Sequence, residues 1–395
     1  DDGFHLWSDN YDRELTNIFA IQDEIAGSIA QALKVSLKLT TGSAGNLTGT
    51  NSIEAYEHYL KGMALWHLRT VGSLRESIEE FEKAIVLDPK FAKAHAGLAL
   101  NWAIIADYVS MDSKATIQNA SQSANRALSI DPDNVEAITA LSQVALKEFR
   151  YKETIDLLQR AVALNPSFAT AHQWLGGSLA EMGDPVAGLV SLQNAWSLDP
   201  RSRIIGANMA YVLANLGHNQ EAVDVLTQIV TFAPNFADAY ELLMHIAIVT
   251  GDCESALEAG NQVAKILNKQ ANAIGTYLDL CQTDDTVLRA SAIDTILNWS
   301  NSEFSDEMSP SLSYPEELLG VIVELGEFDA ALKLIEKYHL IYSDFGLAWI
   351  LRPKRSKNGI SFYCDSRVQS IFEQRGIPRV EGVDICDWFR SLFND

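Results

Sequence analysis

The segment Ala161-Val-Ala-Leu-Asn-Pro166 returns in related form at a fixed interval through the middle of the chain. The closing prolines stand 34 residues apart, in Ala127-Leu-Ser-Ile-Asp-Pro132, Ala195-Trp-Ser-Leu-Asp-Pro200 and Ile229-Val-Thr-Phe-Ala-Pro234. Each segment is an apolar run ending at a proline, and proline cannot continue a helix. The interval therefore predicts a repeating helical unit that breaks at every proline.

The unit 135–168 shows what one repeat contains. Ile138, Leu141 and Ala145 share one helical face, and a second apolar stripe follows a turn near residues 149–151. A single pair of helices buries too little apolar surface, so neighbouring copies must stack to share a core. Turns in later units begin with a glycine, which tolerates the positive φ found after a helix: Gly183, Gly217 and Gly251.

A helix–turn–helix unit of 34 residues with this proline resembles the tetratricopeptide repeat. The resemblance implies an all-α superhelix of about eight hairpins. We expect regular repeats over 53–268, degenerate hairpins over 269–340 and a helical cap over 341–395. Pro89 and Pro132 are 43 residues apart instead of 34, so nine extra residues lie between Ile105 and Gln118. They predict that both helices and the turn of this repeat are longer, forming either a projecting hairpin or a knob that contacts a partner.

Residues 1–39 do not follow the repeat. Phe4-His-Leu-Trp7 alternates like a short strand, and a helical stripe follows, formed by Ile18, Ile21, Ile25, Ile29, Leu33 and Leu37. The segments Leu6-Trp-Ser-Asp-Asn-Tyr-Asp-Arg13 and Ile18-Phe-Ala-Ile-Gln-Asp-Glu-Ile25 resemble the end of the TolB-like domain of bacterial signalling proteins, which precedes tetratricopeptide repeats. An orphan strand and apolar helix need cover, so we expect them to pack on the repeats or to form a homodimer through residues 1–39. The polar residues 40–52 predict a flexible linker.

The opening repeat carries Tyr59-Leu-Lys-Gly62 and Phe81-Glu-Lys-Ala-Ile-Val-Leu-Asp-Pro89, which resemble the same signalling family. That family places its repeats after a class III adenylate cyclase, a protein kinase or a winged-helix regulator of the ToxR/CadC kind. The resemblance implies the sensory or scaffolding part of a larger bacterial regulator. The alternatives are a regulatory module of a cyclase or kinase, and a structural spacer or dimerisation region.

The sequence contains no catalytic motif of the GxGxxG, P-loop, HExxH or GxSxG type. Among eight histidines, His95 and His172 occupy equivalent places in their repeats, and Tyr240 takes that place later. Repetition of a large side chain at one position predicts packing, not metal or acid–base chemistry. We therefore expect no enzyme activity, no cofactor and no metal site.

Composition restricts the partners. The chain has 52 acidic and 30 basic residues and a net charge of −22, which repels phosphate backbones, so we expect no direct nucleic-acid binding. No apolar run reaches the roughly 18 residues of a membrane span.

The first residue is Asp1, not Met, which suggests a fragment of a longer bacterial protein. For that protein we expect the cytoplasm more than the periplasm.

Four cysteines, Cys253, Cys281, Cys364 and Cys386, show no CxxC spacing. They are either apolar filling or, for Cys364 and Cys386, a disulfide that implies an oxidising compartment.

The remaining candidate site is the groove that the first helices line in tetratricopeptide arrays, which takes extended or helical peptides. Counting along each first helix places these residues there: Lys93, Glu136, Thr139, Gln143, Thr170, Gln173, Ala207, Asn208, Tyr211, Asp238, Glu241 and His245. One end is small and neutral and the other is acidic and aromatic, so we expect a basic or mixed protein segment. The family's clamp on a C-terminal carboxylate needs repeated Lys or Arg and Asn, and only Lys93 and Asn208 fit it.

Overall fold

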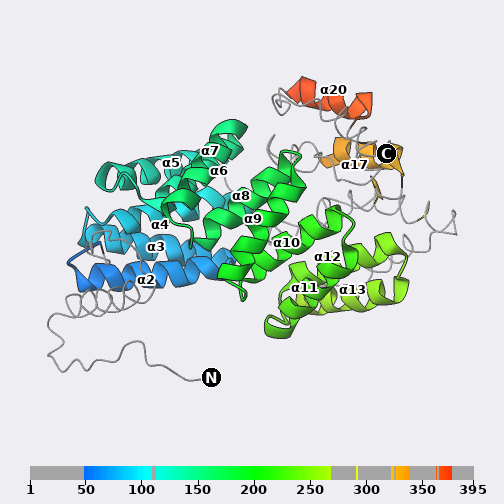
Figure 1. Ribbon diagram of the computed structural model, residues 1–395, viewed down its shortest axis with the longest axis horizontal. Helices are drawn as coiled ribbons and strands as arrows, with labels where there is room; N and C mark the ends of the chain where they lie inside the picture. The colour runs from blue at the N-terminus through cyan, green and yellow to red at the C-terminus, as the bar shows by residue number, and fades with distance from the viewer. Residues whose placement is uncertain are drawn as a thin grey trace, which may run out of the picture. The chain divides into compact units, whose positions relative to one another are not determined.

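The computed structural model describes residues 49–108, 113–267, 291, 322–323, 326–338, 362 and 364–375. Within these ranges every regular element is helical (Figure 1). The chain divides into two compact units, Asp1–Trp102 with Asn119–Ala137 and Ala103–Gln118 with Ile138–Asp395.

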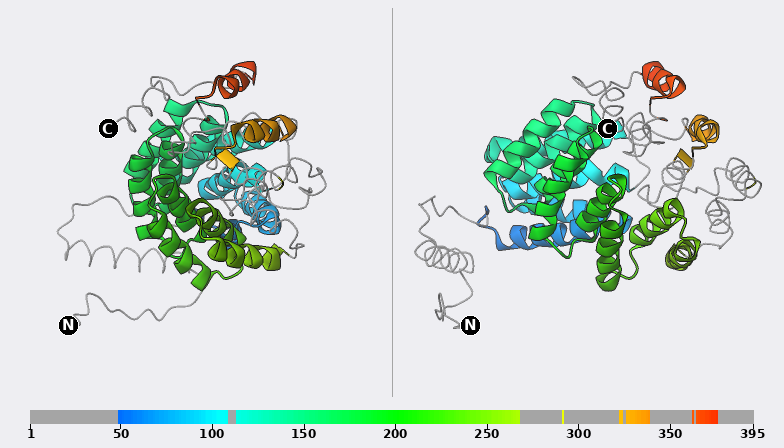
Figure 2. Two further views of the ribbon diagram at one scale, coloured as in Figure 1. Left: turned by 90° about the vertical axis from the view of Figure 1, so that its right-hand side faces the viewer. Right: turned by 45° about the vertical axis from the view of Figure 1, so that its right-hand side comes forward.

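The helices come in antiparallel pairs. The first pairs are formed by α2 (Ile53–Leu68), α3 (Val71–Leu87), α4 (Ala92–Ile104) and α5 (Ser113–Ile130). They are followed by α6 (Val135–Lys147), α7 (Tyr151–Leu164), α8 (Ala169–Glu181), α9 (Pro185–Leu198), α10 (Arg203–Asn215), α11 (Asn219–Phe232), α12 (Ala237–Thr250) and α13 (Cys253–Leu267). In the second unit, α8 to α13 each pack on the next helix along the chain, as the green helices of Figure 2 show.

The helix starts repeat with the predicted period. The first helices α6, α8, α10 and α12 begin at residues 135, 169, 203 and 237, and the second helices α7, α9, α11 and α13 begin at 151, 185, 219 and 253. Both series advance by 34 residues at every step. The all-α fold of stacked tetratricopeptide-type hairpins is therefore confirmed.

The residue before each closing proline ends its helix. Asp88, Asn165 and Asp199 have φ of −140°, −139° and −139°, because the ring of a following proline disfavours the helical conformation. Each still donates its backbone N–H to the carbonyl four residues earlier, and its own carbonyl accepts a hydrogen bond from the residue three further on. The same turn thus joins one hairpin to the next.

Helices α8 and α9 of one hairpin approach each other closely at two glycines. A Cβ at Gly176 on α8 would lie 2.7 Å from the backbone oxygen of Gly188 on α9 and 2.7 Å from Leu192 Cγ. A Cβ at Gly188 would lie 2.6 Å from the backbone oxygen of Gly176. Backbone cannot move aside as a flexible side chain can, so both positions must stay small. The next residue, Gly177, has nothing within 4 Å of the corresponding point.

This contrast predicts opposite effects from one substitution at adjacent positions. Gly176→Ala should lower the free energy of unfolding by about 1–3 kcal/mol, because the added methyl group overpacks the helix contact. Gly177→Ala should leave stability unchanged or raise it by up to about 1 kcal/mol, since alanine is the better helix former. Urea unfolding followed by circular dichroism measures both, and equal effects of the two substitutions would contradict the close approach.

The turns within hairpins place one residue in the left-handed region. Gly183, Gly217 and Gly251 have φ of +92°, +80° and +79°, as their sequence position predicts. Phe149 occupies the equivalent place between α6 and α7 with φ of +60°. Its turn has the same hydrogen bond as the others, from Arg150 N to Ala145 O at 2.8 Å. The left-handed conformation costs a residue with a Cβ roughly 1–2 kcal/mol, so this turn carries strain that the glycine turns avoid.

Comparing two substitutions isolates that strain. Phe149→Gly and Phe149→Ala both remove the edge-to-face ring contact with Tyr151, but only glycine also relieves the backbone. We expect the Gly variant to be about 1 kcal/mol more stable than the Ala variant, the reverse of the usual order. Thermal unfolding of the two purified variants tests this, and a more stable Ala variant would show that Phe149 is not strained.

The extra residues of the second repeat lengthen one helix only. α5 has 18 residues, against 14 in α7, α9 and α11, so the expected longer second helix is confirmed. The first helix α4 has 13 residues, the length of α6, and was wrongly expected to be longer. A short 3-10 helix, Ile105–Asp107, follows it instead. Asp107 of this 3-10 helix forms an ion pair with Lys147 on α6, with 2.7 Å between Oδ1 and Nζ. A role of this region as a partner knob stays a prediction.

Several expectations fall partly or wholly outside the described residues. The TolB-like stretch 1–39, with its short strand, lies outside them, and so does most of 269–361. In the last part of the chain, α17 (Phe328–Tyr338) and α20 (Ser366–Arg375) lie where the apolar patterns predict helices. Of the linker 40–52, residues 49–52 are described. There Thr50 is buried and its Oγ1 donates a 2.5 Å hydrogen bond to Asp88.

The described cysteines, Cys253 and Cys364, are both disulfide-bonded, so apolar filling does not describe them. Cys281 and Cys386 lie outside the described residues, and the Cys364–Cys386 pairing stays a prediction.

Candidate functional site

The first helices of three consecutive hairpins lie next to one another in the second unit. α10 packs on both α8 and α12, so their side chains form one continuous surface. It includes eight of the residues that the sequence places in a groove: Thr170, Gln173, Ala207, Asn208, Tyr211, Asp238, Glu241 and His245. Thr139 and Gln143 lie on α6 in the same unit, whereas Lys93 and Glu136 belong to the first unit.

Burial separates these residues into three groups. Thr139, Thr170, Gln173 and Glu241 are buried, with Glu241 only 5% exposed. Tyr211 is 40% exposed, and the others are half-buried: Lys93, Glu136, Gln143, Ala207, Asn208, Asp238 and His245. Tyr211 is therefore the side chain that an approaching ligand would reach most readily.

A cation that the sequence interpretation missed lies beside the acidic end of this surface. The guanidinium carbon of Arg203, at the start of α10, lies 5.0 Å from the ring centre of Phe236, which caps α12. This distance suits a cation–π contact. Burial raises the pKa of Asp238 to about 6, although its own backbone hydrogen bond and the nearby Arg203 charge act in the opposite direction. Only the packing of α10 on α12 brings Arg203 close to Asp238.

The repeated histidines have a structural role. His172 Nε2 lies 2.9 Å from the carbonyl oxygen of Pro166, and His95 Nε2 lies 3.2 Å from that of Pro89. Burial lowers the pKa of His95 and so favours the neutral ring, although the hydrogen bond to Pro89 acts in the opposite direction. In both repeats the imidazole joins a first helix to the preceding proline turn. The packing role predicted from their equivalent positions is confirmed.

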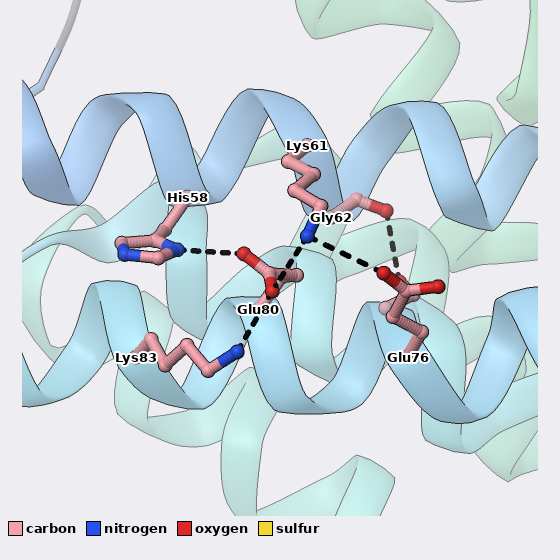
Figure 3. Close-up of polar contacts among 7 residues, drawn as sticks. His58, Lys61, Gly62, Glu76, Glu80 and Lys83 are labelled. Atoms are coloured by element: carbon pink, nitrogen blue, oxygen red, sulfur yellow. Dashed lines mark hydrogen bonds and ion pairs between the residues drawn. The ribbon is translucent and has the colours of Figure 1, made fainter.

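The side chains between α2 and α3 form a second polar cluster, shown in Figure 3. Glu80 is 2% exposed and accepts hydrogen bonds from Lys61 Nζ at 3.0 Å and Lys83 Nζ at 2.8 Å. His58 Nδ1 lies 2.6 Å from its other oxygen. Burial alone would raise the pKa of Glu80, but the hydrogen bonds from Lys83, His58 and Lys61 outweigh it and lower the pKa to about 2. A carboxylate held ionised by three donors suits helix pairing better than proton transfer.

Because the pKa of Glu80 is about 2 in the folded protein and ordinarily about 4.5, its ionisation favours folding. The contribution is complete above pH 4.5 and is lost as the pH falls toward 2. We expect Glu80→Gln to lower the free energy of unfolding by about 1–3 kcal/mol at pH 7. That difference from the native protein should shrink below pH 4.5.

Glu79→Gln, at an exposed position of the same helix, is the control and should change stability little. Urea unfolding of the three proteins between pH 7 and pH 3 provides the measurement. A loss in Glu80→Gln that does not vary with pH would contradict the ionised cluster.

Among the described residues, no group of three or more His, Cys, Asp or Glu side chains is arranged to hold a metal ion. None of the described helices is both long and apolar enough to cross a bilayer.

No family model matches the chain. Over 138 residues it is 33% identical to putative adenylate cyclase 3 of Rhizobium meliloti (strain 1021), which covers 34% of this chain and 23% of that protein. Over 197 residues it is 26% identical to anaphase-promoting complex subunit 7 of Mus musculus, covering 43% and 34%. The chain therefore spans about a quarter to a third of the length of these curated relatives.

Solved structures with a similar helical arrangement include tetratricopeptide proteins. The pilus biogenesis factor PilW is 16% identical with a TM-score of 0.44, covering 55% of this chain and 96% of that one. PilF of Pseudomonas aeruginosa is 18% identical with a TM-score of 0.41, covering 59% and 98%. YrrB, described as a TPR protein with an unusual peptide-binding site, is 21% identical with a TM-score of 0.35, covering 54% and 97%.

Proposed function

We propose that this chain is a non-enzymatic scaffold that binds a basic or mixed-charge protein segment on the surface of α8, α10 and α12. The observation that carries the proposal is the combination of exposed Tyr211 on α10 with the half-buried carboxylate Asp238 on the adjacent α12. Aromatic side chains supply most of the contact energy in many interfaces, and carboxylates select cationic partners. The net charge of −22 supports the same choice of partner.

The proposed scaffold belongs to a larger bacterial signalling protein. The resemblance of residues 1–39 to the end of a TolB-like domain supports this, as does the 33% identity with part of a putative adenylate cyclase. We propose that the array receives a signal by capturing a protein segment and passes it to an output domain. A cyclase is the output domain that the identity favours. A kinase or a ToxR/CadC-type winged helix is the alternative.

Two inferences about the cellular compartment of this protein disagree. From the sequence we expect the cytoplasm. The disulfide-bonded state of Cys253 and Cys364 favours an oxidising compartment such as the bacterial periplasm, because disulfides persist there.

The proposed site predicts which peptides bind and which substitution matters. Fluorescein-labelled peptides of equal length, either basic, mixed or acidic, would be titrated with the full chain by fluorescence anisotropy. We expect the basic peptides to bind most tightly. Asp238→Asn should weaken them about 5- to 10-fold, since one charge-assisted contact is lost, and Tyr211→Ala should weaken all binding peptides about 10-fold.

The pH provides a second readout of the same site. The pKa of Asp238 is about 6, so the native protein should lose affinity for basic peptides between pH 7 and pH 5 as this carboxylate is protonated. Asp238→Asn should lack that part of the pH dependence. Asp224→Asn is the matched control, because Asp224 is an exposed carboxylate on the second helix α11. Equal effects of the two Asn variants, or preference for acidic peptides, would contradict the proposed site.

A further inference from the structure

An apolar stripe lies exposed along α2, the first helix of the described residues. It consists of Ile53, Leu60, Ala64 and Leu68, which are 7, 4 and 4 residues apart and so share one face of the helix. Ile53, Leu60 and Leu68 are 41%, 48% and 53% exposed. The opposite face of α2 carries the buried residues Ala55, Tyr59, Gly62 and Trp66 and packs on α3.

A stripe of this size needs an explanation. Apolar side chains exposed singly are ordinary, but several along one face of a helix mark an interaction surface. On α2 the row Leu60, Ala64 and Leu68 is contiguous, and Glu57 separates it from Ile53. The end of a stacked array is also where an apolar face has no neighbouring hairpin to cover it. The remaining question is what covers the α2 stripe.

We propose that the chain's own residues 18–37 cover the α2 stripe as an additional helix. Their apolar residues recur at helical spacing from Ile18 to Leu37, which predicts one continuous stripe to match that of α2. A helix over 18–37 would be about 30 Å long, and α2, with 16 residues, is about 24 Å long. The two stripes are therefore similar in length and in chemistry.

The connection to α2 makes this docking sterically simple. Thr50 is held at the start of α2 by its hydrogen bond to Asp88, and Ser52 caps the helix by accepting from Ala55 N. The segment between residue 37 and residue 49 is rich in Gly, Ser and Thr and can extend over roughly 35 Å. It can therefore return residues 18–37 to the same face of α2 at a high effective concentration.

Charge order favours an antiparallel arrangement. α2 carries Glu54 and Glu57 in its first half and Lys61 in its second half. Residues 18–37 carry charge in the same order along the chain, with Asp23 and Glu24 in the first half and Lys34 in the second. Antiparallel packing places acidic and basic halves together, whereas parallel packing would place acidic halves together.

Hydrogen exchange of the full chain, measured by mass spectrometry, tests the proposal. Peptides that cover residues 18–37 should exchange about tenfold more slowly in the native protein than in Leu60→Lys, because a charge in the α2 stripe displaces the docked segment. Val86→Lys is the matched control, since Val86 is 80% exposed on α3 and lies outside the stripe. It should leave the exchange of 18–37 unchanged. Exchange of α3, recorded in the same experiment, should be the same in all three proteins.

Light scattering of the same samples identifies the occupant. A monomer with Leu60-dependent protection of residues 18–37 supports docking within one chain. A dimer whose protection falls on dilution would overturn the proposal in favour of a second copy. Fast exchange of 18–37 in the native protein, or equal exchange in the native protein and Leu60→Lys, would also overturn it.

Discussion

The structure depends on apolar stripes that neighbouring hairpins bury for each other. In the second unit one core passes without interruption through several helices, including Leu192 on α9, Ala210 on α10 and Leu226 on α11. No single hairpin could bury these side chains alone, and the helices must approach closely to do so. Gly176 and Gly188 permit that approach where backbone meets backbone. Helix length, turn chemistry and the 34-residue period all preserve this stacking.

Features that recur in every hairpin were predictable from the sequence. The helix starts, the proline turns, the glycines of positive φ and the equivalent positions of His95 and His172 each have a local physical cause that acts several times along the chain. A pattern that repeats can be recognised even when any single instance is weak. The helices Phe328–Tyr338 and Ser366–Arg375 were predictable for the related reason that their apolar spacing is helical.

Features that occur once were not predictable. The approach of Arg203 to Phe236 and Asp238, and the donors around Glu80, depend on which side chains two packed helices bring together. The strained turn at Phe149 breaks the glycine pattern, so the pattern could not indicate it. For the candidate site, counting along each helix placed residues on the correct helices. It could not show that Thr170 and Glu241 are covered by neighbouring helices while Tyr211 is exposed.

The contrast between recurring and single features also explains why the fold is easier to predict from the sequence than the binding partner. Stacking constrains the same positions in every repeat, whereas binding uses side chains that differ between repeats. The acidic and aromatic character of α10 and α12 and the apolar face of α2 are two such local departures. Each selects a chemistry, a cationic segment in the first case and an apolar helix in the second.

Whether a hairpin is stable only with its neighbours can be measured by circular dichroism of two fragments. One fragment contains residues 169–200, a single hairpin, and the other contains residues 135–268, four hairpins. We expect the single hairpin to have little helix in water and no cooperative melting. The four-hairpin fragment should be strongly helical and unfold cooperatively. A single hairpin that is helical and melts cooperatively by itself would show that stacking on neighbouring hairpins is not required for stability.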